Sequence, residues 1–281
     1  MRFLFILSLW AMSSWGQITR STMEEMPPLI ELGVGISTFT IPDYPGSAHS
    51  RQLTIPFPTG IIRGDKLRAD QEGGVRGRFF QDPDYELSIS GSLTFSSSTE
   101  DNPVRQGMPG LDGLFELGPT VLIHLKKAKL NSPLKIGLSL PIRLAMSTDW
   151  KRYDDRGAVF NPFIYSFYEN FLVPELTIFS GFDMKFATER YMDYYYSVEP
   201  QYATATRAAY EAKAGYLQSS LYFGFAYTIA NEHTIFVFAQ HLNLNNASNE
   251  ASPLLTDKKQ LAWAVGYTWW FYASEFRGTR Y

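Results

Sequence analysis

Bulky apolar residues alternate with small or polar residues through most of this chain. The stretch 261–272 is the clearest case: its odd positions are Leu, Trp, Val, Tyr, Trp and Phe, and its even positions begin Ala, Ala, Gly and Thr. A period of two with large side chains on one face predicts a β-strand between two unlike environments. Because the pattern recurs with no helix-rich region to cover it, a closed sheet facing lipid outside and polar groups inside is favoured.

Strand-like segments separated by alternately short and long connections predict an up-and-down meander, with the long loops on the outside. The segments are 29–41, 52–62, 66–71, 74–80, 85–95, 115–125, 134–144, 159–168, 176–186, 217–228, 234–244 and 261–272. Two of them, 66–71 and 74–80, are shorter than the about 9–11 residues of a membrane strand, and ten strands remain without them. We therefore predict an all-β, transmembrane, antiparallel up-and-down β-barrel of about twelve strands, with ten as the alternative and both termini periplasmic.

The first residues differ from the rest. A positive start, an apolar run and small residues before Gln17 predict a secretory signal peptide that is cleaved near Gly16/Gln17. Export and a barrel together predict the outer membrane as the location. The expected organisation is a signal peptide (1–16), a periplasmic lead (17–28), a single transmembrane barrel (29–272) and a C-terminal tail (273–281).

Composition fits this class. Mean hydropathy is −0.16, as expected where lumen and lipid faces average out. The mature chain has no run of about 18 apolar residues, so a helical span is not expected. The absence of cysteine excludes disulfides and a lipid-anchored cysteine. With 25 basic and 28 acidic residues, nothing indicates nucleic-acid binding.

Charged residues on the polar faces of these strands are the candidate functional positions. They are Glu116, His124, Lys135, Arg143, Glu175, Asp183 and Lys185. Such groups can pair and fill a narrow barrel, or line a small aqueous pathway. Twelve strands lie between the eight that side chains fill and the sixteen that leave a channel, and we favour filling. The four histidines lack metal-site spacing, so we expect no metal and no cofactor.

Two further features have local interpretations. The alanine-rich stretch Ala203–Ala214 predicts a short helix in an outer loop. Aromatic residues near strand ends predict interfacial girdles. The girdle candidates are Tyr165, Phe167, Tyr168, Phe171, Tyr267, Trp269 and Trp270.

Several short motifs occur in an order typical of one family. They contain Tyr44, Gly46 and Ser47; Gly107 and Met108; Gly118 and Pro119; and Ser252 and Pro253. Gly266, Trp269 and Phe271 fit the assembly signal of a final barrel strand, although ten residues follow Phe271. Together these motifs make the chain resemble the MipA/OmpV family of outer-membrane proteins, over nearly the whole mature sequence.

The resemblance implies a non-enzymatic barrel that serves as a scaffold. The implied partners are a periplasmic murein lytic transglycosylase and a peptidoglycan synthase, with outer-membrane lipid and lipopolysaccharide around the barrel. Contacts are expected at residues 126–129, 231–232 and 276–281. A narrow diffusion channel for small solutes is the alternative. A lipid hydrolase that uses His124 is a third interpretation without a sequence signature.

Overall fold

The computed structural model describes residues 26–94, 102–127, 133–149 and 151–279. The predicted signal peptide, most of the lead and residues 280–281 of the tail lie outside the described residues. Among the described residues, no helix is long and apolar enough to cross a membrane.

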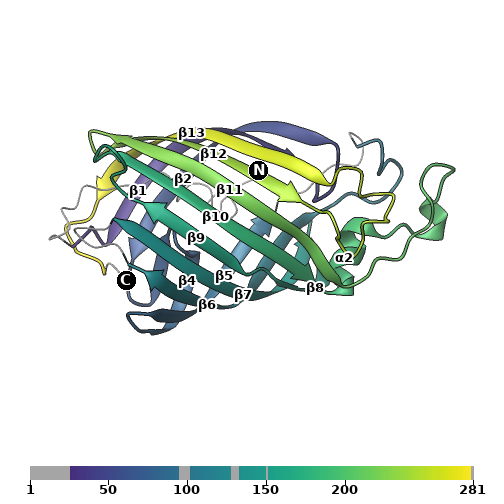
Figure 1. The fold of residues 1–281 in the computed structure, drawn as a ribbon, viewed down its shortest axis with the longest axis horizontal. Coiled ribbons are helices and arrows are strands. Elements are labelled where there is room, and N and C mark those ends of the chain that lie inside the picture. The colour runs from purple at the N-terminus through teal and green to yellow at the C-terminus, as the bar shows by residue number, and fades with distance from the viewer. Residues whose placement is uncertain (1–25, 95–101, 128–132, 150, 280–281) are drawn as a thin grey trace.

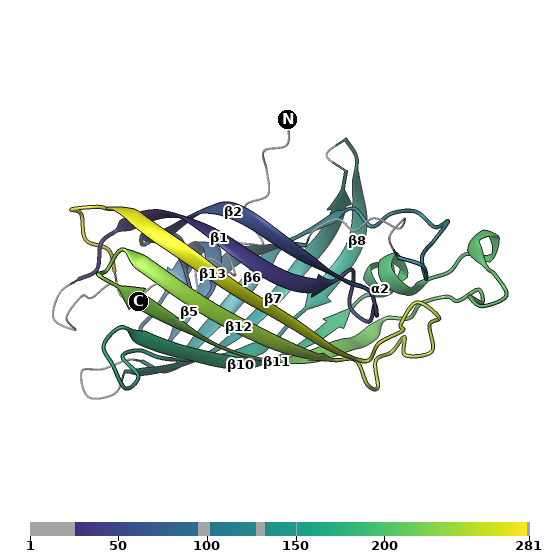
Figure 2. The same cartoon turned by 90° about the horizontal axis from the view of Figure 1, so that it is seen from above.

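One antiparallel sheet dominates the structure. Its strands are β1 (Ile30–Pro42), β2 (Ser50–Arg63), β3 (Leu67–Asp70), β4 (Gly74–Gln81), β5 (Tyr85–Thr94), β6 (Gly113–Lys126), β7 (Leu134–Thr148), β8 (Tyr153–Phe160), β9 (Phe163–Tyr168), β10 (Leu176–Ala187), β11 (Gly215–Ile229), β12 (His233–Asn243) and β13 (Lys259–Ala273). Apart from β8 and β9, each strand pairs with its neighbour in sequence, and β1 also pairs with β13, so the sheet closes into a barrel (Figures 1 and 2).

The barrel is twelve strands around, as predicted. Strands β8 and β9 together occupy one of the twelve strand positions, because both pair with β7 on one side and β10 on the other. They are separated only by Asn161 and Pro162, and proline cannot donate a ladder hydrogen bond. The short segments that left the count open are β3 and β4, which form a small hairpin in the wall.

The two ends of the barrel differ. Short turns and the described termini lie at one end, called here the terminal end (Figure 1). Long loops and the helix α2 (Glu189–Tyr196) lie at the other end, called here the lid end. The alternation of short and long connections predicted from the sequence is therefore confirmed, except that two connections on the lid side are short: 71–73 between β3 and β4, and 149–152 between β7 and β8, where a longer loop was predicted.

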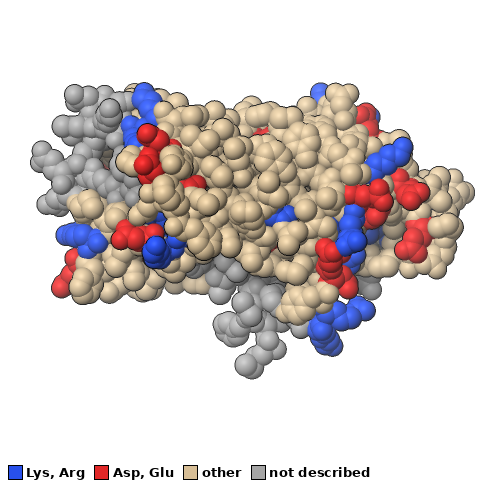
Figure 3. Space-filling view, turned by 90° about the horizontal axis from the view of Figure 1, so that it is seen from below, with Lys and Arg blue, Asp and Glu red and all other residues tan. Residues whose placement is uncertain are grey.

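Outward side chains form the apolar belt that the alternation predicts. On β13, Leu261, Val265 and Trp269 are 61%, 44% and 44% exposed, whereas Ala262 and Ala264 point inward and are buried. Figure 3 shows Lys, Arg, Asp and Glu gathered toward the two ends of the barrel, with few charged atoms between them. This distribution matches an outer surface that crosses a hydrocarbon layer.

The lumen differs from our expectation because much of it is apolar. Strand β2 points Leu53, Ile55, Phe57 and Ile61 inward rather than outward, so its polarity is inverted relative to the other strands. An inner cluster, called here the lumenal aromatic belt, is built from several strands. Its members are Phe39, Phe57, Tyr165, Phe167, Phe179, Tyr222, Phe236 and Phe238.

Glycines on neighbouring strands explain how these rings fit. Six inward aromatic side chains lie over a glycine directly opposite in the register. The pairs are Phe57 over Gly35, Tyr165 over Gly137, Phe179 over Gly224, Tyr222 over Gly181, Phe236 over Gly266 and Trp270 over Gly33. A Cβ at Gly224 would lie 2.2 Å from the Phe179 ring, so only glycine leaves room. The girdle prediction is therefore wrong for Tyr165, Phe167 and Trp270, which are buried, whereas Tyr267 and Trp269 are exposed.

The predicted outer helix is also misplaced. Residues 203–214 form an extended loop with isolated bridges, and the helix is instead the tyrosine-rich α2. Helix α2 buries Tyr191, Met192, Tyr195 and Tyr196 on one face. The alanine-rich loop has no such set of large apolar side chains, and tertiary packing of an apolar face outweighs helix propensity.

Candidate functional site

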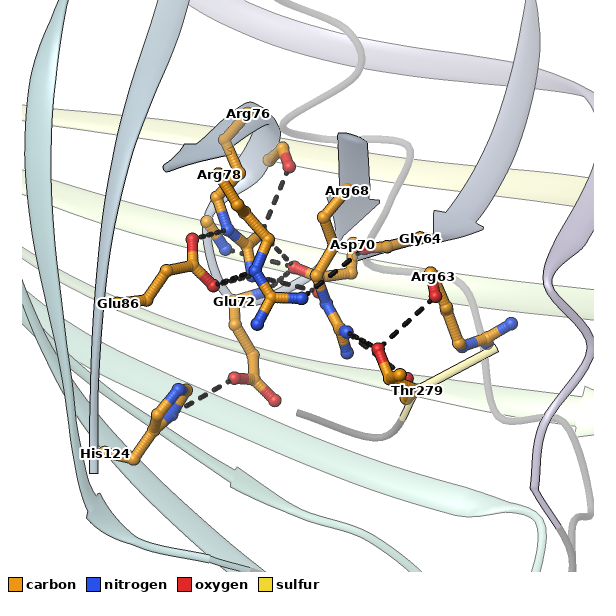
Figure 4. Close-up of polar contacts among 12 residues, drawn as sticks. Arg63, Gly64, Arg68, Asp70, Glu72, Arg76, Arg78, Glu86, His124 and Thr279 are labelled. Atoms are coloured by element: carbon orange, nitrogen blue, oxygen red, sulfur yellow. Dashed lines mark hydrogen bonds and ion pairs between the residues drawn. The ribbon is translucent and has the colours of Figure 1, made fainter. Parts of the chain in front are cut away.

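The lumen at the terminal end holds a buried set of ion pairs, called here the basal cluster: Arg68, Asp70, Arg76, Arg78 and Glu86. Arg76 lies at its centre, with Nη1 2.6 Å from Asp70 Oδ1 and Nε 2.6 Å from Glu86 Oε1. Arg78 Nε lies 2.9 Å from the other Glu86 oxygen. Figure 4 shows these side chains converging inside the barrel from the β3–β4 hairpin and β5.

Alternation along the two short strands creates this geometry. On β4, Arg76 and Arg78 are two residues apart, so both project to the same inner face, where Glu86 of β5 meets them. Asp70 also accepts hydrogen bonds from the backbone N–H groups of Glu72 and Gly73, which holds the hairpin turn. The cluster therefore fixes the shape of the hairpin as well as filling the lumen.

The C-terminal tail reaches the same cluster. Arg68 Nη1 donates to the carbonyl and to the hydroxyl of Thr279, each at 3.2 Å (Figure 4). Backbone hydrogen bonds from Leu29 to Phe276 and from Thr279 to Arg63 hold the tail against β1 and β2. The described part of the tail is thus tied across the terminal end of the barrel.

A second polar group extends from the hairpin turn. Glu72 lies 3.6 Å from His124 Nδ1 on β6 and 3.6 Å from Lys135 Nζ on β7. Lys135 also pairs with Glu169 at 2.8 Å. Glu72, His124 and Lys135 line a shallow recess together with Lys126, Lys127, Ile136 and Tyr165. Within the residues that the structure covers, no set of three or more His, Asp or Glu side chains is arranged to hold a metal ion.

Nearer the lid end, the lumen holds a third polar group. Glu116 is buried and accepts a hydrogen bond from the Tyr191 hydroxyl at 3.0 Å, while Lys185 Nζ lies 3.4 Å away. Arg143 Nη2 donates to Ser90 Oγ at 2.8 Å. Asp183 accepts from Asn161 Nδ2 at 3.2 Å and from Ser220 Oγ at 3.3 Å.

The structure divides the predicted lumen residues between these groups. His124 and Lys135 lie in the second polar group, near the basal cluster. The third polar group, nearer the lid end, contains the other four: Glu116, Arg143, Asp183 and Lys185. Glu175 is half-buried in the turn before β10. The basal cluster itself was not among the candidates, although the inward parity of Arg76, Arg78 and Glu86 was a usable signal.

Outer loops close the lid end with a core of their own. This lid comprises 43–49, 102–112, α2, 197–214 and 244–258. Its buried core includes Tyr44, Met108, Leu111, Met192, Tyr195, Tyr196, Val198, Leu244 and Leu254. Because these side chains come from four different loops, the lid is a packed structure rather than a set of independent loops.

Residues of the family-like motifs hold the lid together. The Tyr44 hydroxyl donates to the Leu254 carbonyl at 2.8 Å, and the Ser252 hydroxyl donates to the Tyr196 carbonyl at 2.7 Å. Gln260 Oε1 accepts from the Gly46 N–H at 2.9 Å, and Gln260 Nε2 donates to the Ser47 carbonyl. Motifs that are more than 200 residues apart in sequence therefore meet at one place.

The remaining motif residues are distributed between lid and wall. Gly107 adopts a positive φ of 80° beside the buried Met108, and Pro253 lies in the turn after Ser252. Gly118 and Pro119 lie in the wall on β6. On β13, Gly266 faces inward under Phe236, whereas Trp269 and Phe271 face outward.

Two buried arginines bind lid carbonyls. Arg105 Nη1 donates to the Tyr195 carbonyl at 2.9 Å, and its guanidinium lies 5.5 Å from the centre of the Tyr44 ring. Arg207 donates to the carbonyls of Val104 and Tyr202, each at 2.7 Å. These contacts satisfy loop carbonyls that packing removes from water.

The lid is expected to loosen in alkali. Burial raises the pKa of Tyr44 from 10.0 to about 12, although nearby Arg105 opposes the shift. A raised pKa means that the neutral phenol stabilises the folded lid fully below pH 10, and that this contribution is lost as the pH rises through about 12. Proteinase K cleavage of the lid loops should therefore accelerate between these values. A cleavage rate that stays flat over this range would contradict the expectation.

Comparison with known proteins finds one matching family and several solved structures with a similar fold. The family model described as MltA-interacting protein MipA matches residues 34–271. No curated protein sequence matches the chain.

Among solved structures, an outer membrane channel from Pseudomonas putida F1 is 11% identical, with 91% of this chain and 100% of that chain covered and a TM-score of 0.45. The NanC porin is 11% identical, with 86% and 98% covered and a TM-score of 0.38. OmpT of Vibrio cholerae is 8% identical, with 91% and 100% covered and a TM-score of 0.39.

Proposed function

The chain belongs to the MltA-interacting protein MipA family, and from this premise we propose that it is a non-enzymatic outer-membrane scaffold for periplasmic peptidoglycan enzymes. In this role its terminal end faces the periplasm and holds a murein lytic transglycosylase, with a peptidoglycan synthase as a further partner. The family description, which names an interaction with MltA, carries the proposal.

The contents of the barrel support a scaffold over a channel. Aromatic rings line the middle of the lumen, ion pairs occupy the terminal end, and a packed lid closes the other end. A diffusion pore needs a continuous polar path through the barrel. The terminal end is then the part of the protein that is left to meet periplasmic partners.

Apolar side chains project from the terminal end. Leu172 is 86% exposed in the β9–β10 turn, where it adopts a positive φ of 63°, and Phe276 in the tail is 77% exposed. Exposed apolar groups held in a strained turn are typical of contact sites. Among the expected contacts, residues 128–129 and 280–281 lie outside the described residues, and the Leu172 turn is a candidate that the sequence did not indicate.

Replacing Leu172 with aspartate is expected to weaken binding of a purified murein lytic transglycosylase at least about tenfold. The change removes the apolar tip of the turn, and aspartate tolerates the left-handed backbone that Leu172 adopts. Surface plasmon resonance on the full-length protein in nanodiscs measures the affinity.

The matched control is Tyr153→Asp. Tyr153 is 67% exposed on β8, toward the lid end, and this variant should bind as the wild type does. Equal affinities of the wild type and both variants for the transglycosylase would show that the Leu172 turn is not part of the interface. No detectable binding by the wild type would refute the scaffold proposal itself.

The channel alternative is tested separately in planar bilayers. We expect the wild-type protein to give no discrete conductance steps, because aromatic rings and ion pairs occupy its lumen. Steps that change in Arg143→Ala or Lys185→Ala would favour the channel instead, since both side chains face the lumen.

A further inference from the structure

Residues 274–279 of the tail run across the terminal end of the barrel and are called here the strap. The Gly278 N–H donates to the Pro27 carbonyl at 2.9 Å. The Thr279 N–H then donates to the Arg63 carbonyl at 3.1 Å. Main-chain hydrogen bonds therefore hold the strap against two segments, the lead before β1 and the last residue of β2.

The strap fits this path because one of its residues has no side chain. A Cβ at Gly278 would lie 2.6 Å from the Arg63 Cβ, 2.8 Å from the Arg63 carbonyl oxygen and 3.2 Å from the Leu29 Cα. Backbone atoms cannot rotate away, so only glycine allows this close approach. The preceding residues, Phe276 and Arg277, are exposed. The strap is thus inserted at Gly278 and accessible from outside just before it.

Arg63 also joins the strap to the β3–β4 hairpin. Within the described residues, two residue pairs link β2 to β3, and one of them is Arg63 with Arg68. Arg68 Nη1 contacts both oxygens of Thr279, and its Nε lies 2.5 Å from Asp70 of the basal cluster (Figure 4). The strap, the end of β2 and the hairpin therefore meet at one pair of arginines.

The hairpin that these contacts hold leans into the lumen. Glu72 in its turn lies 3.6 Å from His124 of β6 and 3.6 Å from Lys135 of β7. In the wall, β5 stands between β4 and both of these strands, so the turn reaches past β5 on the inner side (Figure 4). All members of the basal cluster except Glu86 belong to the hairpin. Any movement of the hairpin would therefore move the ion pairs that fill the terminal end.

We propose that the strap is a latch on this hairpin. While the strap is docked, the hairpin stays fixed in the lumen; when the strap is displaced, the hairpin loosens and uncovers the lumen from the terminal end. Phe276, which is 77% exposed, gives a partner access to the strap. A partner that binds the displaced strap more tightly than the docked strap shifts the molecule toward the loose hairpin. The inference rests on the proposed scaffold function only for the kind of partner, a periplasmic protein.

Hydrogen exchange followed by mass spectrometry, on the full-length protein in nanodiscs, measures the latch. Gly278→Val expels the strap by its clash with Arg63, so residues 64–78 should exchange at least about tenfold faster than in the wild type. Peptides from β11, which pairs with β10 and β12, are the internal reference and should not change. Arg277→Val is the matched control, because it places the same side chain at an exposed position one residue away.

Coupling between two elements is reciprocal, so loosening the hairpin must loosen the strap. Glu72→Gln weakens the contacts of the hairpin turn and should speed exchange of the strap at least about threefold. If Gly278→Val does not fold, Thr279→Pro replaces it, because proline lacks the N–H that bonds Arg63. A hairpin that stays protected while the strap exchanges freely would overturn the proposal. So would a hairpin loosened by Glu72→Gln beside an unchanged strap.

The same measurement tests displacement by a partner. A purified murein lytic transglycosylase added to the wild type should speed exchange of residues 64–78 as Gly278→Val does. Binding without faster exchange would show that this partner leaves the strap docked, against the proposal. An absence of binding would count against the scaffold function, and the exchange of Gly278→Val would then decide the latch alone.

Discussion

Replacing Arg76 with methionine is expected to lower the free energy of unfolding by about 3 kcal/mol. Arg76 is 2% exposed and contacts both Asp70 and Glu86. Methionine fills a similar length of lumen but leaves the two carboxylates with fewer cationic partners. Arg68 and Arg78 still reach one acid each, which keeps the expected loss at the lower end for a broken buried pair.

Urea titration of the protein in lipid vesicles measures this loss, with the folded fraction followed by the gel shift. Arg152→Met is the matched control, because Arg152 pairs with Asp149 at 3.8 Å while its side chain is 78% exposed. Exposed pairs contribute little, so the control should change stability by less than about 0.5 kcal/mol. Similar losses in both variants would mean that the basal cluster does not behave as a buried ionic network.

Replacing Gly118 with alanine is expected to cost at least about 3 kcal/mol, at or above the upper range for overpacking. A Cβ at this position would lie 2.0 Å from the Ile142 carbonyl oxygen and 2.7 Å from the Arg143 Cα. Both atoms are backbone, so no side-chain rotation relieves the clash, and the β6–β7 ladder would have to separate.

Gly77→Ala provides the control within the same barrel wall. A Cβ at Gly77 meets no atom within 4 Å, so this variant should fold as the wild type does. The measurement is the proportion of heat-modifiable barrel in outer-membrane fractions, followed by urea titration of whatever folds. Normal yield and stability for Gly118→Ala would show that β6 and β7 do not approach as closely as described.

The class of fold was accessible from the sequence because alternation is a local signal. Strand β13 shows it in every residue from Leu261 to Trp269, and the count of twelve strands around the barrel follows from counting such stretches. The direction of the aromatic rings was not accessible. Tyr165 and Trp270 carry the same apolar label as Tyr267, and only the register places each opposite a glycine or facing outward.

The candidate sites depend on contacts across long separations in sequence. Glu86 meets Arg76 ten residues away, which alternation could have indicated, but Arg68 meets Thr279 across 211 residues. The lid motifs were recognised as a family pattern without any indication that they touch. Helix α2 was missed because its tyrosines have modest helix propensity and form a helix in contact with the lid core.

The bonds from Tyr44 to Leu254 and from Gly46 to Gln260 have a temporal consequence. The first outer loop of the chain, 43–49, is held in place by the last outer loop, 244–258, and by β13. The cap over the mouth is therefore complete only after β13 has paired with β1. A partly inserted or truncated chain would thus have an unsealed mouth at the lid end. Completion of assembly and loss of permeability would then be a single event, visible as simultaneous protection of both loops from added protease.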